Sequence, residues 1–241
     1  MLFRSFEERF LYHCDKKGYI VWGEYPNWGL DHSHAESVLG MLPEWLEELA
    51  RDFNHPAIVG WCPFNETWDY AGRRQNDDVL RLVYLATKAV DTTRPCIDTS
   101  GNFHVITDIF DVHDYDQNPQ TFAEHYNTLT AEGTLYDHHS ARQTYKAGVP
   151  VFVSEYGGIR WTKEEKGWGY GNAPVTEEEF LTRLEGLTDV LLNNSRMFGL
   201  CYTQLYDVEQ EQNGLYKYRR QPKFPPEKIK KIFSKKAAIE E

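Results

Sequence analysis

Two kinds of hydrophobic pattern alternate along this chain. One is a short, continuously apolar run, and the other is a longer segment in which apolar residues recur at helical spacing, as at Leu46, Leu49, Ala50 and Phe53. Apolar runs without polar alternation predict parallel strands buried on both faces, and the longer segments predict amphipathic helices. The predicted strands are residues 19–24, 57–62, 95–99, 109–113, 151–155 and 199–205. Strands and helices in this order predict an α/β fold.

Local signals mark where several helices begin and end. Gly18 follows two lysines and predicts the end of a first helix over residues 3–17. Pro43 is expected to open the second helix. Thr176 and Glu179 have the spacing of a capping box, and the helix after them presents one apolar face. The residues of that face are Phe180, Leu184, Leu187 and Leu191.

Helical and strand periodicity alone permits either an open doubly wound sheet or a closed (β/α)8 barrel. The polar residues favour the barrel, because they stand at or just past the ends of different strands, where barrel enzymes build their active sites. These residues are Glu24, Asn65, Glu66, His113, Asp114, Tyr115, Glu155 and Gln204. No glycine-rich phosphate loop accompanies the strands, which weakens a nucleotide-binding alternative.

The charge balance narrows the classes of partner. The chain has 37 acidic and 26 basic residues, a formal net charge of −11, and both kinds are spread along its length. Nucleic acid and anionic membranes are therefore not expected as partners. The segment carries no predicted signal peptide, and no stretch approaches the roughly 20 apolar residues of a membrane span. The cellular compartment is not determined by these features.

Two glutamates supply the pair of carboxyl groups that glycosidic cleavage requires. One carboxylic acid must protonate the leaving oxygen, and an ionised carboxylate must attack or stabilise the anomeric carbon. Glu66 follows the apolar strand at 57–62 within an aromatic segment, and Glu155 ends the strand at 151–155. A structural salt bridge is the alternative for either glutamate, and a turn residue is the alternative for the neighbouring Asn65.

The chain resembles the catalytic TIM barrel of glycoside hydrolase family 2, the family of β-galactosidases, β-glucuronidases and β-mannosidases. The motifs that carry the resemblance are Tyr19-Ile-Val-Trp-Gly-Glu24, Asn65-Glu66, Asp91-Thr-Thr-Arg-Pro95, Ser154-Glu155-Tyr-Gly, and residues 203–216. The resemblance implies that Glu66 is the general acid/base, that Asn65 binds the sugar 2-hydroxyl, and that Glu155 is the nucleophile. It also implies a retaining reaction through a covalent glycosyl-enzyme intermediate.

The chemistry of the pair agrees with these roles. A negative Glu155 should raise the proton affinity of Glu66, and glycosylation of Glu155 then removes that charge, so that Glu66 can act as a base. A retaining pair also predicts carboxyl groups about 5 to 5.5 Å apart.

Further residues are candidates for binding a carbohydrate substrate. Trp68 is expected to stack on a sugar, whereas Trp61 lies within a strand and can equally be a core residue. His113 and Tyr115 either line the sugar pocket or are hydrogen-bonded packing residues. Gln204 stands in the last strand, where the resemblance implies a tryptophan, so the floor of the pocket is not defined.

No cofactor and no metal are expected. His32, His34 and Glu36 lie close in sequence, but they occupy a predicted loop without a matching fourth ligand, and a solvated loop is the favoured interpretation. The four cysteines form no CxxC pair or zinc-ligand spacing.

The strand count predicts an incomplete barrel within one domain, residues 1–241. Glu66 and Glu155 end the second and fifth predicted strands, whereas the resemblance places these residues on barrel strands four and seven. The chain would then supply strands three to eight as an open, six-stranded sheet, with weak or absent activity unless another polypeptide supplies the missing strands or sandwich domains. The alternatives to an enzyme are a non-catalytic carbohydrate-binding barrel and an inactive remnant of a glycosidase.

Overall fold

The computed structural model describes residues 6–69, 72–131, 133–139, 141–162 and 166–241. The chain divides into two compact units. The N-terminal unit comprises residues 2–111 and 139–144, and the C-terminal unit comprises residues 112–138 and 145–241. The expectation of a single domain stays a prediction.

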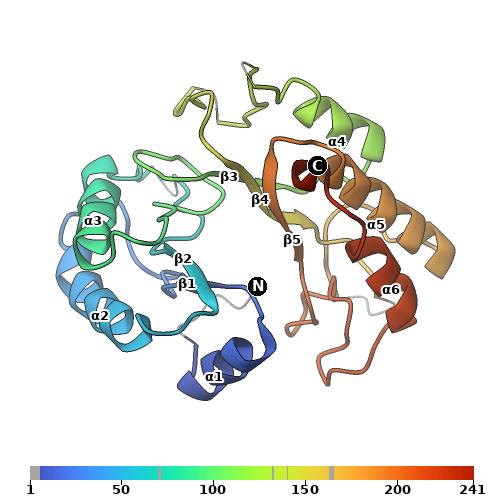
Figure 1. Cartoon of the computed structure of the whole chain (residues 1–241), viewed down its shortest axis with the longest axis horizontal. Coiled ribbons are helices and arrows are strands. Elements are labelled where there is room, and N and C mark those ends of the chain that lie inside the picture. Colours follow the sequence, from blue (N-terminus) through green and yellow to red (C-terminus); the bar gives the residue numbers. More distant parts are fainter. Residues whose placement is uncertain (1–5, 70–71, 132, 140, 163–165) are drawn as a thin grey trace. The chain divides into compact units, whose positions relative to one another are not determined.

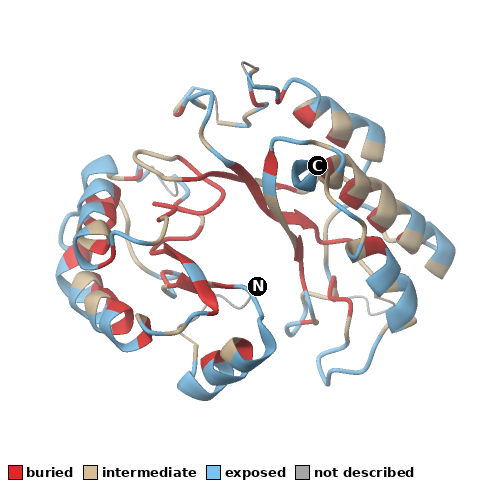
Figure 2. Ribbon diagram, viewed as in Figure 1, coloured by how far each residue is buried: buried red, intermediate tan, exposed pale blue. Residues whose placement is uncertain are grey.

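The N-terminal unit pairs two parallel strands beside helices (Figure 1). Its elements are α1 (Glu8–Lys17), β1 (Val21–Glu24), α2 (Ser37–Asp52), β2 (Ile58–Cys62) and α3 (Asp77–Val90). β1 and β2 are parallel, and α2 packs against α3. The burial pattern in Figure 2 shows that the buried residues of α2 and α3 lie along one side of each helix, as an amphipathic pattern requires.

Close packing between β1 and β2 depends on two glycines that face tryptophans. The strand register sets Trp22 opposite Gly60 and Gly23 opposite Trp61. A Cβ atom on Gly60 would lie 1.8 Å from the Trp22 ring, so only glycine fits there. Trp61 is fully buried and its indole N–H donates to Asp91 at 2.9 Å. Trp61 is therefore a core residue rather than a surface on which a sugar stacks.

The predicted strand at residues 95–99 is not a continuous strand. It makes single parallel bridges, Trp61 to Cys96 and, just beyond the predicted range, Asn65 to Ser100. Carboxylates take the backbone N–H groups that a further ladder would use: Asp108 accepts from the Cys96 N–H at 2.9 Å. Side-chain acceptors of this kind compete with strand pairing, and an apolar pattern does not reveal them.

The C-terminal unit contains a three-stranded sheet in the order β3-β4-β5, with β4 and β5 parallel. Its strands are β3 (Phe110–Asp114), which begins in the N-terminal unit, β4 (Val151–Gly157) and β5 (Met197–Thr203). Its helices are α4 (Pro119–Tyr126), α5 (Glu177–Leu192) and α6 (Pro226–Phe233), followed by the short η1 (Ala238–Glu240). α5 packs against α4, α6 and β5. The predicted apolar face of α5 is confirmed, since all four of its residues are fully buried.

Two of the predicted helix boundaries are confirmed and one is wrong. Gly18 ends α1 with a φ of 65°. The Thr176 hydroxyl accepts the Glu179 N–H at 3.1 Å and begins α5. Pro43, however, lies inside α2, which begins six residues earlier at Ser37. Proline is commonest in the first turn but does not always mark it.

The described residues thus contain five strands in two hydrogen-bonded sheets, rather than one sheet of six. The α/β class and its parallel pairing agree with the predicted architecture. No helix in the described part of the chain has the length and apolar character needed to cross a membrane.

Candidate active site

The segment that follows β2 presents Glu66 from a constrained turn. Glu66 has a φ of 48°, in the left-handed region that side chains other than glycine seldom occupy. Its N–H donates to the Ser100 carbonyl at 2.9 Å, and its carbonyl accepts the Trp68 N–H at 2.8 Å. The buried Thr67 hydroxyl donates to the Gln75 side chain. Strained backbone of this kind persists where the surrounding contacts hold it.

The positive φ predicts an unusual order of stability for two variants that both lack the carboxyl group. Glu66→Gly should be more stable to unfolding than Glu66→Ala by about 1 kcal/mol, because only alanine carries a Cβ into the left-handed conformation. Urea denaturation of both variants measures the difference. An alanine variant that equals or exceeds the glycine variant would contradict the described turn.

The Asn65 side chain is buried without a hydrogen-bond partner among the described residues. The residue is 4% exposed, and neither its amide nitrogen nor its amide oxygen makes a hydrogen bond within the described chain. Burying such a group costs free energy unless a ligand satisfies it. The Asn65 side chain is therefore suited to bind a hydroxyl group that can both donate and accept.

An aromatic cluster lies next to Glu66. The Trp68 ring is 45% exposed, and its N–H is 3.4 Å from a Glu66 carboxylate oxygen. Trp68 packs edge-on against Phe103 and His139, and the Arg142 guanidinium lies 4.1 Å from the centre of the Phe103 ring. An exposed tryptophan supported in this way presents an apolar surface of the kind on which sugars stack. Phe103 and His139 were not predicted from the sequence, because they lie far from Trp68 along the chain.

A buried charge cluster supports the Ser100 carbonyl that holds Glu66. Asp111 accepts hydrogen bonds from the Ser100 hydroxyl at 2.7 Å and from the Gly101 N–H. His104 lies between two buried carboxylates, with Nδ1 2.7 Å from Asp98 and Nε2 3.0 Å from Asp111. Burial lowers the pKa of His104, but the charge of Asp98 and the hydrogen bonds outweigh burial and hold that pKa well above its usual value. The direction of this shift favours the protonated form of His104 between the two carboxylates.

In the C-terminal unit, β4 delivers Glu155 into a buried position beside Tyr115. Glu155 is 3% exposed, and one of its carboxylate oxygens accepts a hydrogen bond from the Tyr115 hydroxyl. His113 Nδ1 lies 3.6 Å from the same oxygen. Burial raises the pKa of Tyr115 far above its usual value, and the negative Glu155 raises it further. Tyr115 is thus a neutral donor, and it holds one oxygen of the Glu155 carboxylate.

Tyr170 was not predicted from the sequence, although it completes this arrangement. Its ring stacks on Tyr115 with centroids 3.5 Å apart and an interplanar angle of 4°. The Tyr170 N–H donates to the Gly158 carbonyl at 2.9 Å. A Cβ atom on Gly158 would lie 2.4 Å from the Tyr170 ring, so glycine permits the close approach. These contacts fix the orientation of the Tyr115 ring.

Gln204 lies just after β5 and is engaged by the motif that follows it. Its side-chain N–H₂ donates to the Asn213 amide oxygen at 2.9 Å, and the Asn213 amide donates to Glu211 at 3.1 Å. Gln204 is 6% exposed and Asn213 is fully buried. The motif over residues 203–216 thus folds back on itself, and a role of Gln204 in binding substrate stays a prediction.

Two histidine arrangements bear on the expected absence of a metal. Asp114, His125 and His138 have potential ligand atoms within 4.8 Å of one another in the C-terminal unit. His125 Nδ1 is 2.7 Å from Asp114, a hydrogen-bond distance, whereas two tetrahedral ligands about 2.1 Å from one zinc would be roughly 3.4 Å apart. His32, predicted to lie in a solvated loop, instead packs edge-on against Phe64 with ring centroids 5.6 Å apart.

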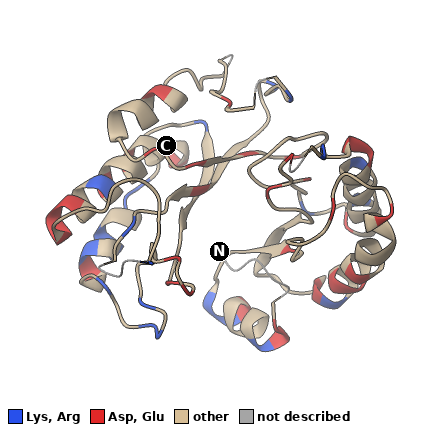
Figure 3. Ribbon diagram, turned by 180° about the vertical axis from the view of Figure 1, so that it is seen from behind, with Lys and Arg blue, Asp and Glu red and all other residues tan. Residues whose placement is uncertain are grey.

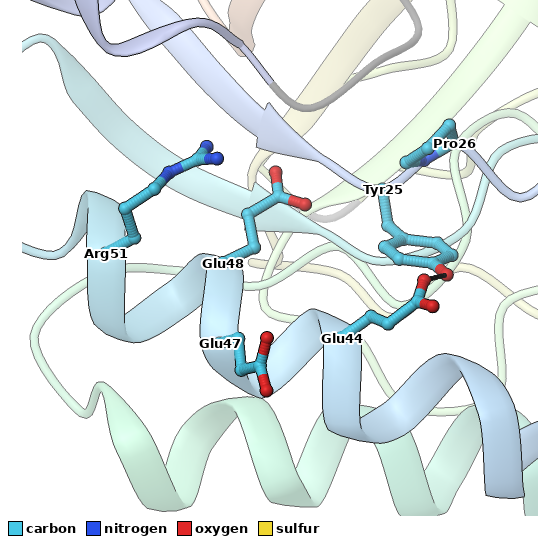
Figure 4. Close-up of a pocket in the computed structure, with 6 residues that line it drawn as sticks. All are labelled: Tyr25, Pro26, Glu44, Glu47, Glu48 and Arg51. Atoms are coloured by element: carbon cyan, nitrogen blue, oxygen red, sulfur yellow. Dashed lines mark hydrogen bonds between the residues drawn. The ribbon is translucent and has the colours of Figure 1, made fainter.

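A hollow of about 380 Å³ in the N-terminal unit carries none of the predicted site residues. Figure 4 shows its lining, which comes from α2 and from the segment after β1: Tyr25, Pro26, Glu44, Glu47, Glu48 and Arg51. The Tyr25 hydroxyl donates to Glu44 at 2.6 Å. Figure 3 marks acidic positions in red along the ribbon of α2. This hollow has an acidic helix as its wall and lacks the Asn-Glu pair on which the prediction rests.

Comparison with known proteins identifies the family. The family described as "Glycosyl hydrolases family 2, TIM barrel domain" matches residues 7–162. The β-glucuronidase of Mus musculus is 36% identical over 93 residues, which are 37% of this chain and 14% of that protein. The β-glucuronidase of Rattus norvegicus is 34% identical over a segment of the same length, again 14% of that protein.

Solved structures share the fold. The β-D-glucuronidase of Dictyoglomus thermophilum superposes with a TM-score of 0.71 at 20% identity, over 95% of this chain and 43% of that chain. A β-galacturonidase from Eisenbergiella tayi, bound to galacturonate, has a TM-score of 0.69 at 19% identity with the same coverage. This chain thus spans less than half of these relatives. The matched family and the shared fold confirm the predicted TIM-barrel type, and the chain belongs to the TIM-barrel domain of glycosyl hydrolase family 2.

Proposed function

We propose that this chain carries the catalytic centre of a retaining glycosidase that hydrolyses β-linked O-glycosides. The observation that carries the proposal is the buried Glu155, whose carboxylate receives the hydrogen bond of the neutral Tyr115. A carboxylate shielded from water and fixed in orientation is the form that a nucleophile needs. Membership of family 2 supports glycosidic hydrolysis as the reaction.

In the first step, Glu155 attacks the anomeric carbon and Glu66 donates its proton to the leaving oxygen. The bond between the anomeric carbon and that oxygen breaks, and its electron pair stays on the departing alcohol. In the second step, Glu66 takes a proton from water, and the water oxygen displaces Glu155 from the anomeric carbon. Two displacements on one carbon give net retention.

The neighbours of Glu66 bind the sugar in this proposal. The Asn65 amide, which no described residue satisfies, hydrogen-bonds the 2-hydroxyl, and the exposed Trp68 ring stacks on an apolar sugar face. The alternatives of a non-catalytic sugar-binding barrel and an inactive remnant also provide sugar contacts. They do not require an activated carboxylate, which is the feature that the tests below address.

Tyr115→Phe should lower kcat by about 10- to 100-fold, because it removes one hydrogen bond to a charged group, worth about 1.5 to 3 kcal/mol. Steady-state kinetics on an aryl glycoside measures the loss. Tyr145→Phe, which removes a hydroxyl bonded to the Val149 carbonyl at 3.0 Å, is the control and should leave kcat near the unmodified value.

The experiment that tests the function combines a substrate panel with one variant. Nitrophenyl β-glucuronide, β-galacturonide, β-galactoside and β-mannoside are offered to the chain to find the sugar, since the relatives named above include a glucuronidase and a galacturonidase. Glu66→Ala is then compared on good and poor leaving groups. The rate of the first step should change little for substrates with good leaving groups, because these groups need little protonation to depart.

Equal losses on both leaving groups would argue against Glu66 as the acid. Weak turnover by residues 1–241 alone does not prevent the assay, since a 2-deoxy-2-fluoro-glycosyl fluoride traps the covalent intermediate in a single turnover. Mass spectrometry should find the label on Glu155. A chain that neither turns over any glycoside nor becomes labelled would favour the non-catalytic alternatives.

A further inference from the structure

We infer that Asn27 is a positioning residue for the Asn65–Glu66 segment, an inference that rests on the proposed function. Asn27 lies three residues after β1 and is 1% exposed. Its carboxamide oxygen accepts the Asn65 N–H at 2.8 Å, and its carboxamide nitrogen donates to the Asn65 carbonyl at 2.8 Å. One side chain thus holds both polar groups of the Asn65 backbone.

This side chain acts where strand pairing has ended. The register between β1 and β2 runs to Glu24 and Cys62, and the last backbone bond on that side joins the Tyr25 N–H to the Cys62 carbonyl. On its other side, the segment still pairs with Ser100 through the Phe64 carbonyl and the Glu66 N–H. The Asn65 N–H and carbonyl point the opposite way, as alternation along a strand requires, and Asn27 occupies the place of the missing neighbour strand.

His32 fixes the orientation of the Asn27 carboxamide. The carboxamide nitrogen lies 3.1 Å from His32 Nε2. That nitrogen can only donate, so His32 Nε2 accepts and the ring is neutral. Burial lowers the pKa of His32 below its usual value, although Asp31 opposes the effect, and a neutral ring agrees with this direction. A carboxamide turned the other way would set two acceptors, its oxygen and the Asn65 carbonyl, against each other.

The consequence for Glu66 follows from the backbone on which it stands. Its φ of 48° is unfavourable for a glutamate, so the turn relaxes when its neighbours release it. Without the Asn27 side chain, the N–H and carbonyl of Asn65 lose their partners. The backbone then moves toward other partners or water, and this movement shifts the side chains of Asn65 and Glu66. A small displacement of a proton donor is costly for catalysis.

The experiment uses the full chain with Asn27→Ala, which removes both contacts, and Asn27→Asp, which keeps an acceptor and removes the donor. The control is Asn76→Ala, which removes a side chain that caps α3 by accepting the Asp78 N–H at 3.0 Å. The first readout is the ratio of kcat/KM for a good leaving group to that for a poor one. Loss of folded protein lowers both values equally and leaves the ratio unchanged.

Both Asn27 variants should raise that ratio at least tenfold, and Asn76→Ala should leave it unchanged. The second readout is hydrogen exchange at the Asn65 amide, which should be faster in Asn27→Ala at a pH where the Asn76 control still protects it; Asn27→Asp keeps the acceptor of that N–H and should retain more of the protection. If Asn27→Ala does not fold, the ratio for Asn27→Asp, which loses the donor to the Asn65 carbonyl, carries the test. An unchanged ratio in the Asn27 variants, or an Asn65 amide in Asn27→Ala as protected as in the control, would overturn the inference.

Glu66→Ala in the same panel separates this inference from the proposed function. If Glu66→Ala selectively loses activity on the substrate with the poor leaving group and the Asn27 variants do not, only the positioning role fails. If Glu66→Ala shows no selectivity, the assignment of the acid fails first, and the positioning role fails with it.

Discussion

Glu155→Ala should abolish turnover, and azide or formate should restore part of it with the opposite stereochemistry. We expect kcat to fall by four or more orders of magnitude, which corresponds to an increase of more than about 5 kcal/mol in the activation free energy of the reaction. Removing the carboxylate leaves space beside the anomeric carbon, and a small anion then attacks from that face. Because only one displacement occurs, a β-glycoside yields an α-glycosyl azide.

Proton NMR of the product measures the configuration directly, and kinetics with increasing azide measures the rescue. Glu178→Ala, a change at an exposed carboxylate in the first turn of α5, is the control and should neither lose activity nor respond to azide. A β-configured product from Glu155→Ala, or equal rescue of the control, would exclude Glu155 as the nucleophile.

The elements near the candidate site were predictable because each depends on a local pattern. β2, which precedes Glu66, has no polar side chain, and β4, which contains Glu155, opens with the apolar run Val151-Phe-Val. Short runs of this kind can be recognised as strands without knowledge of their neighbours in the fold. The turn at Glu66 was not predictable in the same way. Its N–H donates to the carbonyl of Ser100, which lies far away along the chain, and glutamate carries no local signal for a left-handed conformation.

Residues that act through long-range contacts escaped the sequence analysis for the same reason. Asn27 is 38 residues from Asn65 along the chain, and the stacked Tyr170 is 55 residues from Tyr115. A lone asparagine after a strand is more often a turn residue, and an isolated tyrosine is more often packing. Only the folded arrangement shows that each one completes a hydrogen-bonded or stacked pair.

The buried charges near Ser100 show a further limit of prediction from the sequence. Asp98, His104 and Asp111 lie in a segment predicted partly as a strand and partly as a connection, and their sequence spacing matches no catalytic or metal motif. In the structure Asp98 accepts the Val105 N–H and Asp111 accepts the Gly101 N–H, so these carboxylates hold the backbone that connects the two predicted strands. Asp111 also accepts the hydrogen bond of the Ser100 hydroxyl, and the Ser100 carbonyl accepts the Glu66 N–H.

His104→Ala should destabilise the N-terminal unit by about 3 to 5 kcal/mol, because it leaves two buried carboxylates without their cation. Urea denaturation monitored by tryptophan fluorescence measures the change. His34→Ala is the matched control: that imidazole is 65% exposed and lies 3.8 Å from Asp31, so its loss should change the stability by less than about 0.5 kcal/mol.

The contribution of His104 should also depend on pH in a definite direction. Its pKa in the folded protein is raised well above the unfolded value near 6.5, so the folded state binds the proton more tightly. The stabilisation is therefore fully present below about pH 6.5 and is lost as the pH rises toward and through the folded pKa. The stability difference between the unmodified chain and His104→Ala should shrink over that range. A difference that stays constant or grows with pH would mean that His104 is neutral in the fold, and the two carboxylates would then need another source of positive charge or a shared proton.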